Sequence, residues 1–253
     1  MTVNTIAQEG IQITDRNART SPLIYARIAG VLYLVITIAA IIAHFYVPDT
    51  LIVPDDAAAT ASNIMDSESL FRFGGIGGEL VVLLCEIVLS IILYVLLKPV
   101  SNMLSLIAAV SRLIMTAVHG INLLNYFFVL LILTDSTYTA SFDTDQQHAL
   151  VSLFLDAHHY GFAIGIAFLT LHVFALGYLI YKSGYIPRIL GVLFLIAGFG
   201  YLIDSIGILL LADYESPGFI ALPIAIAEIA FPIWLLIKGV NIEQWTKRAL
   251  ESA

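Results

Sequence analysis

Six long apolar runs dominate the sequence and limit what the chain can fold into. They cover residues 28–47, 76–97, 113–133, 151–180, 189–211 and 219–237. Each run reaches about the 20 residues that cross the hydrocarbon core of a bilayer. Only 12% of the 253 residues are charged and 60% are hydrophobic, and a soluble domain of this size could not cover so much apolar surface. The sequence therefore predicts an all-α polytopic membrane protein, a bundle of six transmembrane helices.

The polar ends of the sequence define the predicted domain organisation. Residues 1–22 form a polar tail, residues 23–240 hold the six spans, and residues 241–253 form a second tail. The first tail lacks the basic and apolar regions of a signal peptide. The single cysteine, Cys85, excludes an intrachain disulfide, and we expect it to be a small buried hydrophobe.

Lysine and arginine are distributed unevenly among the connections between the runs. They lie before the first run, in the second and fourth connections, and after the sixth run. The other three connections carry acidic residues, and Arg72 is their one basic residue. Cytoplasmic loops carry the excess of basic residues. We therefore expect both termini in the cytoplasm and the chain in the inner or plasma membrane. Arg112, which this division places in the second connection, is interpreted as one of these topology signals.

The fourth and fifth runs are predicted to pack as a tight antiparallel hairpin. Small residues let helix backbones approach each other in lipid, and both runs are rich in glycine, including Gly161, Gly165, Gly191 and Gly198. A short turn that contains Pro187 joins them, and proline suits the first turn of the following helix.

Ionisable and amide side chains interrupt the apolar runs at a shared depth. Each ionisable group costs about 2.5–3.5 kcal/mol to insert, so such residues usually face the interior of a bundle. The candidates at or near the outer half of the membrane are Glu79, Glu86, His119, Asn122, Asp156, His158, His159, Asp204 and Glu228. Their common level predicts one polar cavity that opens to the outer face. His172 lies deeper toward the cytoplasm and is not included, and His44 is expected to lie at the interface.

Helical spacing shows which of these side chains can meet. Glu79 and Glu86 are seven residues apart and share one side of their helix. His119 and Asn122 belong to a polar stripe at three-residue steps. His158 and His159 are adjacent and point about 100° apart, so they cannot both face one site.

Four functions fit these candidates. The preferred hypothesis is ion, proton or small-solute transport, because acids buried in helix bundles often mark such pathways. A metal-dependent intramembrane hydrolase is the alternative, with zinc held by residues drawn from His158, His159, Asp204 and Glu228. No HExxH motif supports it, and an enzyme is the less favoured interpretation. Haem between histidines on two helices, or a non-catalytic scaffold held together by interhelical polar contacts, would also use these residues.

The composition also limits the partners. No basic patch of the size that nucleic acids require is present. The lipid bilayer is the expected partner, and the sequence leaves the oligomeric state open.

Four segments resemble a known family: ARIAGVLYLV, DDAAATASNI, LFLDAHHYGFAIGIAFLTLHVFALGYLI and KSGYIPRILGVLFLIAGFGYLID, with WLLIKGV near the end. The chain is similar here to a prokaryotic integral membrane family, domain of unknown function 4386. The resemblance covers nearly all of the sequence after residue 22. It implies a polytopic membrane protein and supplies no activity, substrate or catalytic residue.

Overall fold

The computed structural model describes residues 21–252, so the predicted tail at residues 1–22 lies almost entirely outside the described part. The described residues form helices and no strand, which confirms the all-α prediction. The elements are α2 (Pro22–Ala40), η1 (Ile41–Tyr46), α3 (Val47–Leu51), α4 (Ala57–Asp66), η2 (Leu70–Gly77), α5 (Gly78–Leu97), α6 (Asn102–Asn122), α7 (Leu124–Thr134), α8 (Ser136–Thr139), α9 (Thr144–Ser183), α10 (Arg188–Leu210), α11 (Gly218–Ile237) and α12 (Ile242–Glu251). The elements η1 and η2 are wider π-helical segments.

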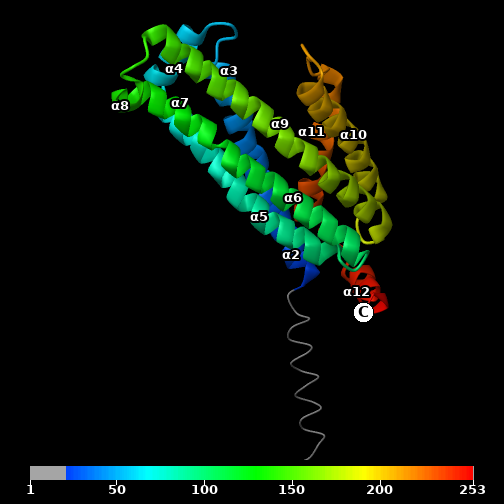
Figure 1. Cartoon of the computed structure of the whole chain (residues 1–253). Coiled ribbons are helices and arrows are strands. Elements are labelled where there is room, and N and C mark those ends of the chain that lie inside the picture. Colours follow the sequence, from blue (N-terminus) through cyan, green and yellow to red (C-terminus); the bar gives the residue numbers. More distant parts are fainter. Residues whose placement is uncertain (1–20, 253) are drawn as a thin grey trace, which may run out of the picture.

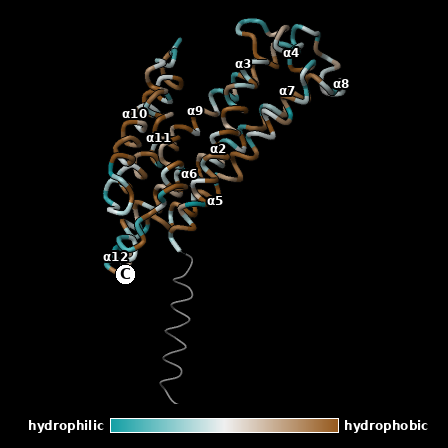
Figure 2. Tube along the Cα trace, turned by 180° about the vertical axis from the view of Figure 1, so that it is seen from behind, coloured by the Kyte–Doolittle hydropathy of each residue, from teal (hydrophilic) through white to brown (hydrophobic). Residues whose placement is uncertain are grey.

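Six continuous helical segments are long and apolar enough to cross a membrane. They are Pro22–Leu51, Leu70–Leu97, Asn102–Thr134, Thr144–Ser183, Arg188–Leu210 and Gly218–Ile237. The described part of the chain therefore has the length and hydropathy of a six-pass membrane protein. Apolar residues follow the middle of these segments, whereas hydrophilic residues gather in the connections and at α12 (Figure 2).

Local signals explain where the longest helix begins and ends. Asp143 caps the first turn of α9 by accepting a hydrogen bond from the backbone of Gln146, and the Gln146 side chain accepts one from the backbone of Asp143. At the other end Gly184 adopts φ 77°, a left-handed conformation that glycine reaches without a steric penalty. The chain then turns at Pro187 and enters α10.

The third span begins earlier than the sequence prediction. Ser101 caps α6, and the helix runs unbroken from Asn102 through the predicted start at residue 113. Arg112 therefore lies buried inside a span, and its assignment to the second connection was wrong. The apolar segment before Arg112 continues the helix because it contains no proline or glycine between residues 100 and 119.

The six spans form a closed ring in which each packs against two neighbours. The order around the ring is α2, α5, α6, α9, α10 and α11, and α11 packs back against α2 (Figure 1). The hairpin of α9 and α10 has the most extensive contact, and Gly191 and Gly198 lie in it as predicted, whereas Gly161 and Gly165 face α6 instead. At their crossing a Cβ atom on Gly191 would lie 2.6 Å from the carbonyl oxygen of Gly177, so the two backbones touch.

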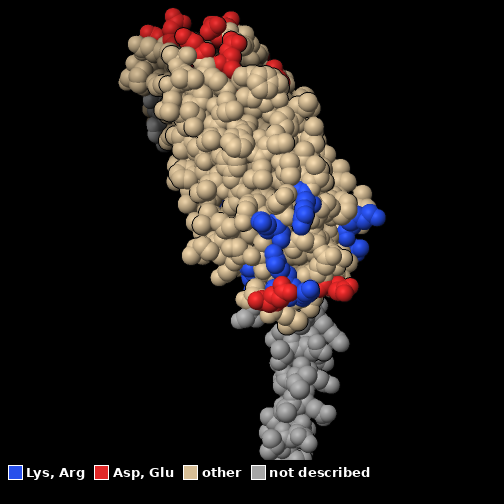
Figure 3. All heavy atoms as spheres, turned by 90° about the vertical axis from the view of Figure 1, so that its right-hand side faces the viewer, with Lys and Arg blue, Asp and Glu red and all other residues tan. Residues whose placement is uncertain are grey.

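Charge divides the molecule into two ends. Acidic side chains gather at the end that carries α3, α4 and α8, and lysine and arginine gather near the opposite end, beside α12 (Figures 1 and 3). The start of α2 and the whole of α12 both lie at the basic end (Figure 1). The described chain thus enters and leaves the bundle on one side, as an even number of spans requires.

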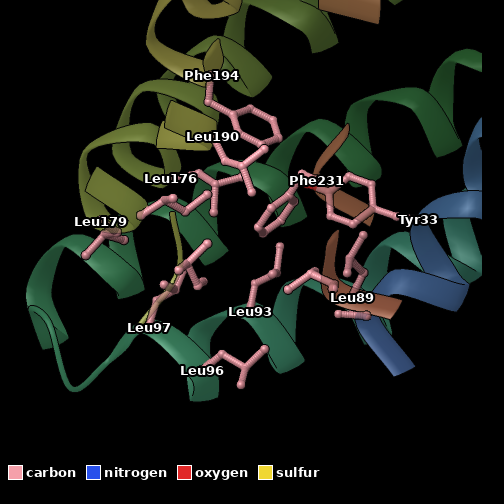
Figure 4. Packing of buried hydrophobic residues seen from close by; sticks show 14 of the residues in the cluster. Tyr33, Leu89, Leu93, Leu96, Leu97, Leu176, Leu179, Leu190, Phe194 and Phe231 are labelled. Atoms are coloured by element: carbon pink, nitrogen blue, oxygen red, sulfur yellow. The ribbon is translucent and has the colours of Figure 1, made fainter. Parts of the chain in front are cut away.

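The main apolar core lies toward the basic end. Its buried side chains come from all six spans, and Figure 4 shows how some of them interdigitate. The labelled leucines and phenylalanines are Leu89, Leu93, Leu96, Leu97, Leu176, Leu179, Leu190, Phe194 and Phe231, which we call the basic-end apolar cluster. Tyr33 of α2 is the other labelled member, and its ring meets that of Phe231 edge to face with 5.7 Å between the ring centres.

Candidate functional site

Arg112 of α6 and Glu86 of α5 form a buried ion pair inside the ring. The Nε atom of Arg112 donates to Glu86 Oε2, and Nη2 donates to Oε1 over 2.9 Å. The pairing is bidentate, which is the strong geometry for a guanidinium and a carboxylate. Both side chains are about 5% exposed, so each ion has lost nearly all its water. A pair of this kind is stable only while both partners stay in place.

Two further side chains complete the surroundings of Arg112. Its Nη1 atom donates to Tyr33 Oη over 2.9 Å and lies 2.9 Å from His172 Nε2. His172 Nδ1 lies 2.8 Å from the carbonyl oxygen of Ala108, which can only accept. Nδ1 therefore carries the proton of a neutral imidazole, and Nε2 accepts from Arg112. Arg112 also lies over the Tyr33 ring, 4.9 Å from its centre.

A second carboxyl group joins this site from the sixth span. Glu228 of α11 accepts a hydrogen bond from Tyr201 Oη of α10 over 3.4 Å. Tyr201 and Glu228 are both half-buried. The hydrogen bonds thus form two groups, Tyr33 with Glu86, Arg112 and His172, and Tyr201 with Glu228. Each of the six spans contributes one of these six side chains, which we together call the central polar network.

The central polar network is closed toward the basic end by apolar side chains. Leu89 follows Glu86 by one turn of α5, and Leu176 follows His172 by one turn of α9. Both belong to the basic-end apolar cluster and are fully buried. Close packing of this kind leaves no polar route along the helix axes. In this structure, apolar side chains therefore separate the central polar network from the basic end of the bundle.

A second polar layer lies closer to the acidic end. His44 Nδ1 in η1 is 3.3 Å from Glu79 Oε1 in α5. The Phe162 ring of α9 contacts the rings of both His44 and His119, each with 4.6 Å between centres. His119 Nε2 lies 3.1 Å from the carbonyl oxygen of Phe162 and donates to it. His44, expected at the interface, is thus half-buried against Glu79 and Phe162.

The remaining members of this layer are Asn122 and His158. The Asn122 Nδ2 atom donates to the carbonyl oxygen of His158 over 2.9 Å. The His158 ring stacks on Tyr126 with 3.8 Å between centres. We call His44, Glu79, His119, Asn122 and His158 the histidine layer.

Glycines let α9 approach α6 closely at this level. A Cβ atom on Gly165 would lie 2.0 Å from His119 Nε2, and one on Gly161 would lie 2.0 Å from Asn122 Oδ1. The predicted small-residue pair of the fourth run therefore packs against the polar stripe of the third run.

The nine predicted site residues separate into three groups. Glu86 and Glu228 belong to the central polar network, and Glu79, His119, Asn122 and His158 belong to the histidine layer. The other three, Asp156, His159 and Asp204, belong to neither. Asp156 and His159 are exposed on α9, and Asp204 accepts a hydrogen bond from Tyr214 over 3.3 Å.

The proposed zinc ligands do not converge. Among residues 21–252, no group of three or more His, Cys, Asp and Glu side chains is arranged to hold a metal ion. Of the four candidates, His158 is buried against Tyr126 while the adjacent His159 is exposed. The rings of His119 and His158 each stack on an aromatic ring, which supports packing rather than axial ligation of haem.

Sequence reasoning missed four members of the central polar network. Tyr33 and Tyr201 were not among the predicted site residues, His172 was set aside as too deep, and Arg112 was assigned to a loop. One signal was available, because Arg112 precedes His119 by seven residues and shares its helix face.

Comparisons with known proteins agree with the sequence resemblance. The family model described as Domain of unknown function (DUF4386) matches residues 28–239. An uncharacterized protein of Archaeoglobus fulgidus is 29% identical over 167 residues, which cover 66% of this chain and 85% of the archaeal protein. No solved structure matches.

Proposed function

The chain belongs to the DUF4386 family, and from this premise we propose that it is a multi-pass protein of the inner or plasma membrane that binds and transfers a proton at its central polar network. The family supplies no activity, so the proposal is argued from the charges of the site. It makes the predicted ion or proton transport more specific.

The observation that carries the proposal is the unequal number of charges in the centre of the ring. Two carboxyl groups, Glu86 and Glu228, accompany one guanidinium, Arg112. His172 is held neutral by its two hydrogen bonds, so it does not balance the second carboxylate. An uncompensated charge at membrane depth costs several kcal/mol. One bound proton makes the network neutral, and Glu228 is its carrier because Glu86 is fully engaged by Arg112.

The distribution of charge supports an orientation with both ends in the cytoplasm. Lysine and arginine gather at the end where α2 begins and α12 lies. Basic residues mark the cytoplasmic side of membrane proteins. The basic-end apolar cluster would then separate the central polar network from the cytoplasm. Transfer of a proton to that side requires these side chains to move apart, as alternating access demands.

A proton-flux measurement tests the proposal. Purified protein is reconstituted in liposomes that contain a pH-sensitive dye, and a pH gradient is imposed. We expect wild-type protein to collapse the gradient and Glu228→Gln to leave it at the rate of empty liposomes. Glu215→Gln is the matched control, because Glu215 is exposed in the loop before α11. Equal flux in wild type and Glu228→Gln would refute the proposal.

The scaffold hypothesis has its own support in the same network. Every guanidinium nitrogen of Arg112 has a partner on another helix, and such contacts also hold helices together. The flux measurement separates the two functions. If the protein is a scaffold, wild type shows no proton flux above that of empty liposomes, and Arg112 variants are less stable but equally inactive.

A further inference from the structure

The histidine layer is brought together by two adjacent departures from regular α-helix. The π-helical segments η1 and η2 pack against each other near the acidic end. His44 lies within η1, and Glu79 follows η2 by two residues. Short π-helical turns inside α-helices are frequently found at functional sites. Both segments here direct an ionisable group to the same point.

Glu79 has one carboxyl oxygen without a partner. Its Oε1 atom lies 3.3 Å from His44 Nδ1, whereas Oε2 is buried and makes no hydrogen bond within the described structure. The residue is only 3% exposed. A buried polar atom that lacks a partner costs about 1–3 kcal/mol, and more if it is charged. Oε2 is therefore an unsatisfied acceptor in the interior, and binding a proton there would remove the cost of its charge.

The ionisable groups near Glu79 include no permanently charged side chain. His44 comes from η1, His119 from α6, Tyr126 from α7 and His158 from α9, and none of them is an arginine or lysine. This contrasts with Glu86, whose charge Arg112 balances. The Glu79 carboxylate is therefore neutralised only if a proton binds, either to its own carboxyl group or to His44 beside it, or if a cation enters the cluster.

We propose that Glu79 and His44 form a second proton-binding site, which receives a proton from the acidic-end side of the membrane. The proton forms an O–H bond with Oε2 of Glu79, which converts the carboxylate to a neutral carboxylic acid. The donor is a hydronium ion at the acidic-end surface, whose O–H bond breaks as the new one forms and which is left as water. The His44 side chain is 16% exposed and gives the site contact with its surroundings.

The position of Glu79 indicates the role of this second site. Glu79 and Glu86 share one side of α5 and are separated by two turns, about 10 Å at the helical rise. His119 and Arg112 have the same separation on α6, and the buried Thr116 hydroxyl lies between them. The histidine layer would thus pass its proton to the central polar network. That role depends on the proposed function, but proton binding by Glu79 can be measured without it.

The test counts protons taken up by purified protein in detergent. The solution is weakly buffered and contains a pH indicator, and the pH is changed rapidly from alkaline to mildly acidic. We expect Glu79→Gln to take up about one proton per chain fewer than wild type. Glu68→Gln, which removes an exposed carboxylate one helical segment earlier, is the control and should match wild type. Equal uptake by wild type and Glu79→Gln would overturn the inference.

Two further measurements make the result independent of folding and of the central site. His44→Gln keeps the Glu79 carboxyl and should alter the pH at which its proton is bound. If Glu79→Gln does not fold, an unchanged uptake profile in His44→Gln overturns the inference.

In Glu228→Gln the proton of Glu79 should still be taken up. Uptake by Glu79 together with an absence of flux in liposomes would support the inference and refute the proposed function. Uptake that sodium ions abolish would show a metal-cation site instead and overturn the proton assignment.

Discussion

Arg112 and Glu86 meet as a bidentate ion pair between α6 and α5. Both residues are buried, and Arg112 also reaches Tyr33 and His172. These hydrogen bonds join α6 to α5, α2 and α9, and lipid offers no polar group that could replace them. The ion pair marks the depth in the bundle at which the central polar network lies.

Loss of Arg112 should destabilise the bundle strongly. Arg112→Gln leaves Glu86 buried without its counter-ion, which costs about 3–5 kcal/mol. Replacing both residues, as Glu86→Leu with Arg112→Met, removes the orphaned charge and should restore most of the loss. The free energy of unfolding in detergent measures both effects. Arg72→Gln, which breaks the exposed pair with Glu68, should cost less than about 1 kcal/mol. A similar small loss for Arg112→Gln would contradict the buried geometry.

The α9–α10 crossing should not tolerate a single added methyl group. Alanine usually gains about 0.5–1 kcal/mol over glycine in a helix. In Gly191→Ala the new Cβ would lie 2.6 Å from backbone atoms of Gly177 and Tyr181, and overpacking of this kind costs about 1–3 kcal/mol. Thermal unfolding should therefore show a lower melting temperature. Gly218→Ala has nothing within 4 Å of its Cβ and should melt like wild type or slightly higher.

The C-terminal helix α12 should detach when Trp245 is removed. The Leu96 carbonyl oxygen, at the end of α5, accepts from Trp245 Nε1 over 2.9 Å and from Tyr185 Oη over 2.7 Å. Burial raises the pKa of the Tyr185 hydroxyl above its usual range, so Tyr185 keeps its proton and remains a donor at any physiological pH. In Trp245→Ala the helix α12 loses its hydrogen bond to α5, and only the bond from Tyr185, which lies in the turn between α9 and α10, remains.

Proteolysis measures this detachment. Trypsin should cut at Lys247 and Arg248 faster in Trp245→Ala than in wild type, because the protease requires a locally unfolded segment. Thr246→Ala changes an exposed neighbour and should leave the rate unchanged. The same cleavage rate in all three proteins would show that Trp245 does not hold α12.

Reporter fusions test the proposed orientation. A reporter that is active only outside the cytoplasm should be silent after residue 253, and active in the connection between Leu210 and Gly218. The reason is the excess of lysine and arginine at the end that carries α12. The opposite pattern would place both termini outside and reverse the direction of the proposed proton pathway.

The sequence predicts the fold of this chain well because lipid restricts the choice so severely. A membrane-spanning segment must satisfy its own backbone, so apolar runs of sufficient length become helices. The six runs, the glycine-rich hairpin and the family all follow from the residues themselves. The start of α6 does not, since Arg112 interrupts the apolar run and resembles a loop residue until a partner is known.

The site was harder to predict because depth does not specify which side chains meet. Asp156 and Glu79 lie at a similar level, yet Asp156 is exposed on α9 while Glu79 is buried beside His44. The rotation of each helix about its own axis decides whether a side chain at this level faces the interior or the surface. His172 was set aside because the site was expected in the outer half, whereas Arg112 lies deeper along α6 and meets His172 there.

The central claim is that Glu228 carries a proton within the network that Arg112 and Glu86 form. Infrared spectroscopy of the purified protein at neutral pH tests this most directly, because a protonated carboxyl group has its own C=O stretching band that shifts in deuterated water. We predict that wild type shows this band and that Glu228→Gln loses the corresponding intensity, while Glu215→Gln retains it. Identical spectra for wild type and Glu228→Gln would show that Glu228 carries no proton and would contradict the account.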